Sequence, residues 1–167
     1  MNNVRRISII GIFIAAALIL SYIENLFFGG LFMPGIKLGL SNSVVVVILY
    51  CFGPVPAMIT GIVKSFLSLL LFGRLSGLLY SLTGIIAAVI CMWLVKKTKR
   101  FSLLGVGVSG SAAHISGQLF AACILLGDSA PLRLFPLLCI LSVVSAVILY
   151  FPEKSVLRLL PGTALRS

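Results

Sequence analysis

The sequence predicts an all-α integral membrane protein with six transmembrane helices, and its bulk composition is the first reason. Of 167 residues, 60% are hydrophobic and only 10% are charged, whereas soluble domains average about 45–50% apolar and about 25% charged residues. A soluble chain of this length could not bury so much apolar surface. An ordinary soluble enzyme and a disordered tail are thereby excluded. One membrane domain covering residues 1–167 is predicted.

Six apolar runs are the second reason, because a helix needs about 20 apolar residues to cross a bilayer. The runs are separated by Gly-Gly and Pro-Gly pairs, a Gly-Pro-Val-Pro turn, a Gly-Arg pair, a basic cluster and a proline-containing loop. The first run is too long for a cleaved signal peptide. The second and third are short, so tilted or partial crossings are expected there. The predicted helices span about 7–28, 39–52, 56–72, 76–95, 103–127 and 134–151, followed by a basic tail over 152–167 that lies on the inner surface or frays.

The cations predict the orientation. With a cytoplasmic N-terminus, nine of the 13 Lys and Arg residues fall on the inside, three fall outside, and Lys64 lies within a span. This bias follows the positive-inside rule, so both termini are predicted to face the cytoplasm in a multi-pass cell membrane protein. The net charge of +10 is therefore interpreted as an orientation signal on a lipid bilayer, and no nucleic-acid partner is expected.

Polar side chains within the spans are expected to face the bundle interior. Most fall in the outer half, with Lys64 and His114 forming a floor near the midplane above an apolar inner half. This pattern predicts an outward-open pocket for a small anionic or zwitterionic molecule, and aromatic or partly apolar ligands also fit. Alternatively, the serines bond their own helices and Glu24 or Lys37 snorkels to the interface. The candidate substrate-binding residues are Glu24, Lys37, Asn42, Lys64, Ser68, Tyr80, His114 and Gln118.

Small residues at four-residue spacing allow close helix approach. The stripe Gly105, Ser109, Ala113, Gly117 and Ala121 in the fifth run is assigned to packing within the protein. Gly11 and Ala15, in the inner half of the first run, are candidates for docking a partner helix.

Catalytic motifs are missing from the sequence. Asp128 is the only aspartate, so the Asp-rich clusters that hold magnesium and diphosphate cannot be built. The chain contains neither a G-x-x-x-x-G-K-[ST] phosphate loop nor a G-x-S-x-G elbow. We therefore expect no catalytic residues, no cofactor and no enzymatic activity.

Several segments resemble a bacterial membrane family known both as heptaprenyl diphosphate synthase component I and as Gx transporter. The most specific are PGIKLGLSN over 34–42 and AHISGQL over 113–119, and the resemblance extends over about residues 7–151. The family is similar to the substrate-binding S components of energy-coupling factor (ECF) importers. The resemblance implies six helices, an outward-facing pocket, and docking of a T component on the first helix at Gly11 and Ala15.

The resemblance leaves more than one function open. The first is capture of a small solute for ATP-driven uptake, with a T component and ATPase subunits as partners and residues 29–37 as a lid. The second is a non-catalytic membrane subunit of heptaprenyl diphosphate or quinone side-chain synthesis. The third is a self-standing channel or carrier, which would transport without ATPases.

Overall fold

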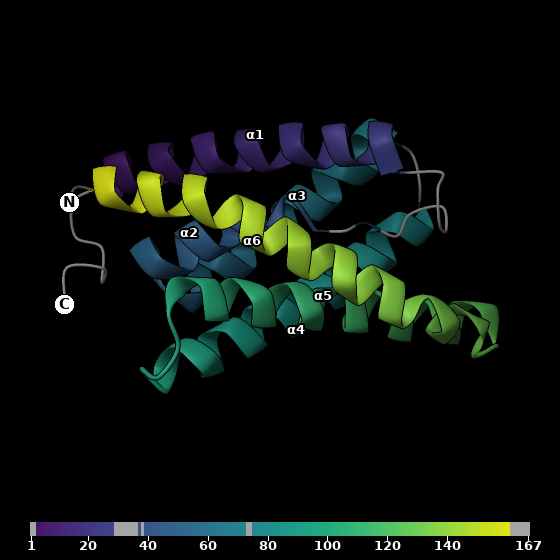
Figure 1. The fold of residues 1–167 in the computed structure, drawn as a ribbon. Coiled ribbons are helices and arrows are strands. Elements are labelled where there is room, and N and C mark those ends of the chain that lie inside the picture. The colour runs from purple at the N-terminus through teal and green to yellow at the C-terminus, as the bar shows by residue number, and fades with distance from the viewer. Residues whose placement is uncertain (1–2, 29–36, 38, 73–74, 161–167) are drawn as a thin grey trace.

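The computed structural model describes residues 3–28, 37, 39–72 and 75–160, and every regular element within them is helical. The elements are α1 (Asn3–Phe28), α2 (Asn42–Phe52), α3 (Pro54–Phe72), α4 (Leu75–Lys97), α5 (Leu103–Leu126), the 3₁₀-helix η1 (Ala130–Leu134) and α6 (Phe135–Leu159). The predicted all-α fold class is confirmed (Figure 1).

Five of the six α-helices are long and apolar enough to cross a membrane. The exception is α2, whose 11 residues extend only about 16 Å at about 1.5 Å per residue. The hydrocarbon core of a bilayer is about 30 Å thick. The prediction of six crossings is therefore confirmed by length for five helices and not for α2. The backbone explains the short helix, because the chain leaves helical geometry at Gly53, where φ is 91°.

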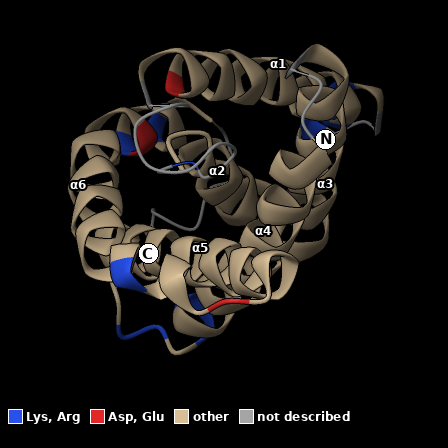
Figure 2. Ribbon diagram, turned by 90° about the vertical axis from the view of Figure 1, so that its right-hand side faces the viewer, with Lys and Arg blue, Asp and Glu red and all other residues tan. Residues whose placement is uncertain are grey.

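Helix α2 lies at the centre of the bundle. It packs against each of the other five α-helices, and Figure 2 shows those helices arranged around it. All six residues from Val44 to Leu49 are buried. A helix that is apolar on every side is typical of such a buried position.

Helices α4 and α5 form the closest pair, and glycines permit their approach. A Cβ atom added at Gly117 would lie 2.6 Å from the backbone oxygen of Thr83 in α4, and one at Gly110 would overlap the Met92 side chain. Part of the predicted small-residue stripe of α5 thus packs within the protein, as expected.

Helix α6 continues beyond its predicted end. We expected a span ending at Phe151, but the helix extends through Pro152 to Leu159, so the predicted start of the tail at residue 152 is wrong. Proline removes one hydrogen bond from a helix. Within a membrane protein, neighbouring helices and local adjustments tolerate that loss. The remaining tail, residues 161–167, lies outside the described residues.

The exterior of the bundle is apolar. Exposed large hydrophobic side chains occur on the long helices, among them Ile12, Leu70, Phe120 and Ile148, and charged positions interrupt the ribbon only sparsely (Figure 2). The start of α1 and the end of α6 lie at the same end of the bundle (Figure 1). The multi-pass membrane location fits this surface, and the side that this end faces stays a prediction.

Candidate binding site

Two buried side chains, from α1 and α5, bind the backbone of Lys37 and Gly39 just before α2. The backbone N–H of Gly39 donates to Glu24 Oε1 of α1 at 2.5 Å. The backbone N–H of Lys37 donates to Gln118 Oε1 of α5 at 3.0 Å. Gly39 has a φ of 94°, which favours glycine. Two distant helices are therefore joined through one short segment.

Lysine and serine side chains extend this network to α3. Lys37 Nζ donates to Ser21 Oγ at 2.8 Å, and Ser21 Oγ lies 3.5 Å from Ser68 Oγ. Lys64 Nζ donates to Ser41 Oγ at 2.7 Å. Lys64 is only 1% exposed, so a full lysine side chain is enclosed by the bundle.

His114 and Gln118 lie one turn apart on the buried face of α5, with 2.6 Å between Gln118 Nε2 and His114 Nε2. Because Gln118 Oε1 accepts from Lys37, its Nε2 is the amide donor, and His114 Nε2 must accept. A neutral His114 then carries its proton on Nδ1. This assignment follows from the hydrogen-bond pattern.

The charges of the cluster are one carboxylate and two ammonium groups. Glu24 is close enough to both Lys37 and Lys64 for attraction between their charges. Burial lowers the pKa of Lys37 from its usual value, and the neighbouring Glu24 carboxylate opposes that shift. With all three groups ionised the cluster carries one net positive charge.

Several polar atoms in this cluster are buried without a hydrogen-bond partner among the described residues. They are Glu24 Oε2, both polar atoms of the Asn42 side chain, and His114 Nδ1. Backbone groups of Leu40 and Gly84 lie near the Glu24 carboxylate and the His114 ring without forming a well-aligned hydrogen bond, so the Asn42 side chain is the least satisfied of these groups. Asn42 and His114 both lie against Gly39, since a Cβ there would be 2.7 Å from Asn42 Nδ2 and 3.4 Å from His114 Cδ2. Burial of an unpaired polar atom costs about 1–3 kcal/mol. Such atoms therefore point to a bound polar molecule that satisfies them.

The structure brings together seven of the eight predicted site residues: Glu24, Lys37, Asn42, Lys64, Ser68, His114 and Gln118. Tyr80 does not join them. It is 4% exposed and packs in a separate apolar cluster with Ile115, Leu119 and Leu138. A phenol ring has a large apolar face and one polar atom. The sequence therefore did not decide whether the Tyr80 side chain joins the polar site or an apolar cluster.

Sequence reasoning did not include several partners of the site. Ser21, three residues before Glu24, lies on the same helix face, and Ser41 precedes Asn42, so both spacings were available as signals. Ser65 Oγ of α3 and Ser81 Oγ of α4 lie 2.7 Å apart. The two backbone donors at Lys37 and Gly39 had no signal in the sequence. The proposed lid, residues 29–37, lies outside the described residues except for Lys37.

Glu153 was expected in a surface tail, but it lies within α6 and is buried. Glu153, near the end of α6, is 5% exposed. That expectation arose because the last predicted span ended at Phe151, two residues before Glu153.

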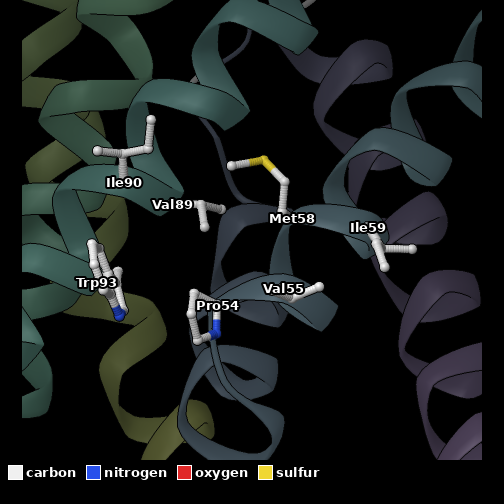
Figure 3. Close-up of a pocket in the computed structure, with 7 residues that line it drawn as sticks. All are labelled: Pro54, Val55, Met58, Ile59, Val89, Ile90 and Trp93. Atoms are coloured by element: carbon white, nitrogen blue, oxygen red, sulfur yellow. The ribbon is translucent and has the colours of Figure 1, made fainter.

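An apolar cavity of about 270 Å³ lies apart from the polar cluster, between α3 and α4 (Figure 3). Six of its seven lining residues are aliphatic, proline or methionine, and Trp93 supplies the one polar side-chain atom. A ligand site normally has several polar groups that fix orientation. The polar cluster is the better candidate site.

Comparison with known proteins agrees with the sequence motifs. The family model described as heptaprenyl diphosphate synthase component I matches residues 13–155. No curated protein and no solved structure shows a significant match to the chain. The matched region covers most of the chain and includes α2 to α5 entirely. The chain therefore belongs to the heptaprenyl diphosphate synthase component I family.

Proposed function

We propose that this protein is the substrate-binding S component of an ECF-type importer and captures a small solute from outside the cell. The observation that carries the proposal is the set of unpaired polar atoms on Glu24, Asn42 and His114, buried beside two lysines. A solute that supplies hydrogen-bond donors and acceptors there would remove their burial cost. The apolar exterior and the five long helices support a membrane-embedded binding role.

The charges of the cluster favour an anionic or zwitterionic solute. Lys37 and Lys64 would attract a carboxylate or phosphate of the solute, while Glu24 Oε2 would accept from an N–H or O–H group. Asn42 offers one donor and one acceptor, and His114 Nδ1 offers a donor. The backbone contacts of Lys37 and Gly39 with Gln118 and Glu24 would keep these two residues beside the bound molecule.

The surface of α1 supports a partner in this role. Gly11 and Ala15 are both exposed, and a Cβ at Gly11 would meet nothing within 4 Å. A glycine that does not pack inside the protein leaves backbone open to another helix. We propose that a T component docks here and transmits the work of separate ATPase subunits.

A thermal-shift screen of the detergent-purified protein tests the proposed site. The ligands are vitamins, quinone precursors and prenyl diphosphates, and a ligand at about 100 times its Kd should stabilise the protein by about 2.7 kcal/mol. His114→Ala and Lys64→Ala should abolish the shift. Ser116→Ala, on the exposed face of α5, and Lys97→Ala are the matched controls and should retain it. An unchanged shift in both site variants would contradict the site.

The second candidate function is a non-catalytic membrane subunit of heptaprenyl diphosphate synthesis, and the family description favours it. The chain has only three acidic residues, so catalysis would belong to a separate, Asp-rich soluble synthase. This alternative predicts that the tagged protein co-purifies with such a synthase. A shift with prenyl diphosphates and none with vitamins would favour it over solute uptake.

A further inference from the structure

Two largely apolar grooves flank the first turns of α3 on the exposed surface of the bundle. One, of about 350 Å³, lies between α1 and α3 and is lined by Arg6, Ile7, Ile10, Pro56 and Ile59. The other is the cavity between α3 and α4 described above, and Ile59 lines both. Among the lining side chains, Ile7, Val55 and Ile59 are exposed. Because these helices are long and apolar enough to cross a membrane, both grooves are open to lipid.

Arg6 places a positive charge in the groove between α1 and α3. Its guanidinium carbon lies 5.5 Å from the centre of the Phe52 ring, and Nη2 donates to the backbone oxygen of Phe52 at 3.4 Å. That bond uses one of the five N–H donors of the guanidinium, and the described residues supply no further hydrogen bond or ion pair to it. An arginine stays charged in protein surroundings. The remaining donors are therefore available to an anion at this end of the groove.

A second cation lies at the corresponding end of the groove between α3 and α4. Trp93 lines that groove together with Pro54, the first residue of α3 (Figure 3). Lys97 Nζ lies 5.3 Å from the centre of the Trp93 ring. Arg6 contacts Phe52, which is two residues before Pro54, so both cations are near the start of α3. None of the three acidic residues of the chain lines either groove.

An anionic lipid headgroup matches these charges. A neutral helix or acyl chain gains little by moving from lipid into an apolar groove, because lipid tails are equally apolar. Selective occupation must therefore come from the charges. A guanidinium binds a phosphate through two parallel hydrogen bonds, and basic pockets between transmembrane helices bind anionic headgroups. The start of α1 is predicted to face the cytoplasm, and the cytoplasmic leaflet carries such lipids.

The two grooves also match the two acyl chains of one lipid. Since they share Ile59, two chains from one glycerol group can pass on either side of the first turns of α3. We propose that an anionic diacyl phospholipid binds here, with its phosphate on Arg6 and one acyl chain in each groove. This inference does not rest on the proposed solute uptake, because it uses neither the polar cluster nor Gly11 and Ala15.

Native mass spectrometry of the detergent-purified protein tests the site. The probes are phosphatidylglycerol and phosphatidylcholine, each with two oleoyl chains, and lysophosphatidylglycerol, which has one. At equal concentrations we expect roughly fivefold more bound phosphatidylglycerol than either of the other two. Only phosphatidylglycerol combines a net negative charge with two chains.

Variants of the groove identify the contact. Arg6→Gln removes the charge and should lower the binding of phosphatidylglycerol to the level of phosphatidylcholine. Arg5→Gln is the matched control, because it removes the same charge from an adjacent exposed position that lines neither groove, and it should retain binding. Ile10→Trp fills the groove between α1 and α3 and leaves Arg6 intact. It should also lower the binding, and it decides the matter if Arg6→Gln does not fold.

Photo-crosslinking in membranes locates the bound lipid. Phosphatidylglycerol with a diazirine on one acyl chain should form adducts within residues 7–10, 54–59 or 89–93, and a benzophenone amino acid at position 59 should form adducts with lipid. A discrete protein adduct from position 59 would assign the grooves to a partner helix and overturn the proposal. Equal binding of the three lipids, equal losses in Arg6→Gln and Arg5→Gln, or displacement of the lipid by glycerol 3-phosphate alone would also overturn it.

Discussion

At the scale of single residues, Glu24 is the anchor of the candidate site. One of its oxygens accepts from the backbone of Gly39, and its charge faces Lys37 and Lys64. The second oxygen has no partner among the described residues. The same carboxylate thus holds the inter-helix segment and offers an acceptor for a ligand.

Substitutions at Glu24 separate its hydrogen bond from its charge. Glu24→Ala removes both and leaves a buried N–H and two lysines unmatched, so unfolding in detergent should become easier by roughly 1–3 kcal/mol. Glu24→Gln keeps an acceptor for Gly39 and should cost less stability. Asn25→Ala, at the adjacent half-buried position, is the control. Equal losses in the Ala and Gln variants would show that the charge, and not the hydrogen bond, stabilises the fold.

At the scale of helices, the close contact between α4 and α5 positions part of the candidate site. Gly84 of α4 lies against the His114 ring, because a Cβ there would be 2.8 Å from its Cε1 and Nδ1 atoms. One turn further along α5, Gly117 lies against the backbone of Thr83 and Gly84. The glycines therefore set the distance between α4 and α5, and with it the position of His114 and Gln118 in the bundle.

Alanine substitutions at two helical glycines test this contact. Gly117→Ala places a methyl group 2.6 Å from a backbone oxygen, so α4 and α5 must separate, and we expect destabilisation of about 1–3 kcal/mol. At Gly11 the methyl group meets nothing within 4 Å, and Gly11→Ala should be neutral or stabilising by up to about 1 kcal/mol. Thermal unfolding in the same detergent compares them. Equal effects would mean that helix propensity alone, without packing, decides stability at Gly117.

At the scale of the whole molecule, the fold is a ring of long helices around a short buried one. The five long helices present apolar side chains to lipid, while polar groups from α1, α3 and α5 converge on the chain that enters α2. This arrangement leaves α1 with one face in the bundle and another face, including Gly11 and Ala15, exposed.

The exposed face of α1 gives a prediction for the proposed importer. Gly11→Leu projects a side chain into open space, so it should leave folding and ligand-induced thermal shifts intact. It should abolish ATP-dependent uptake and co-purification with a T component and ATPases. Ile12→Leu, at an exposed position beside it, should leave both unaffected. Normal uptake by Gly11→Leu would remove this face from the docking model, and transport in liposomes without ATPases would favour a self-standing carrier.

Much of the site could be predicted from sequence because polar side chains in membrane helices are costly in lipid and therefore face the interior of the bundle. Lys64, His114 and Gln118 are buried for this reason. His114 and Gln118 are four residues apart, which places them on the same face of α5. Tyr80 packs in an apolar cluster because its ring is amphipathic, and its role in the site stays a prediction. Glu153 was missed because Pro152 resembles a helix end in sequence.

The sequence by itself determined that this protein is helical and embedded in a membrane, since composition and apolar run length are local properties of the chain. The tertiary structure decided that α2 is central and too short to cross, that the Lys37 and Gly39 backbone joins α1 to α5, and that Glu153 is buried. These features depend on contacts between residues tens of positions apart, such as Lys37 with Gln118. A backbone N–H is common to nearly every residue, so its partner is chosen only when the helices pack.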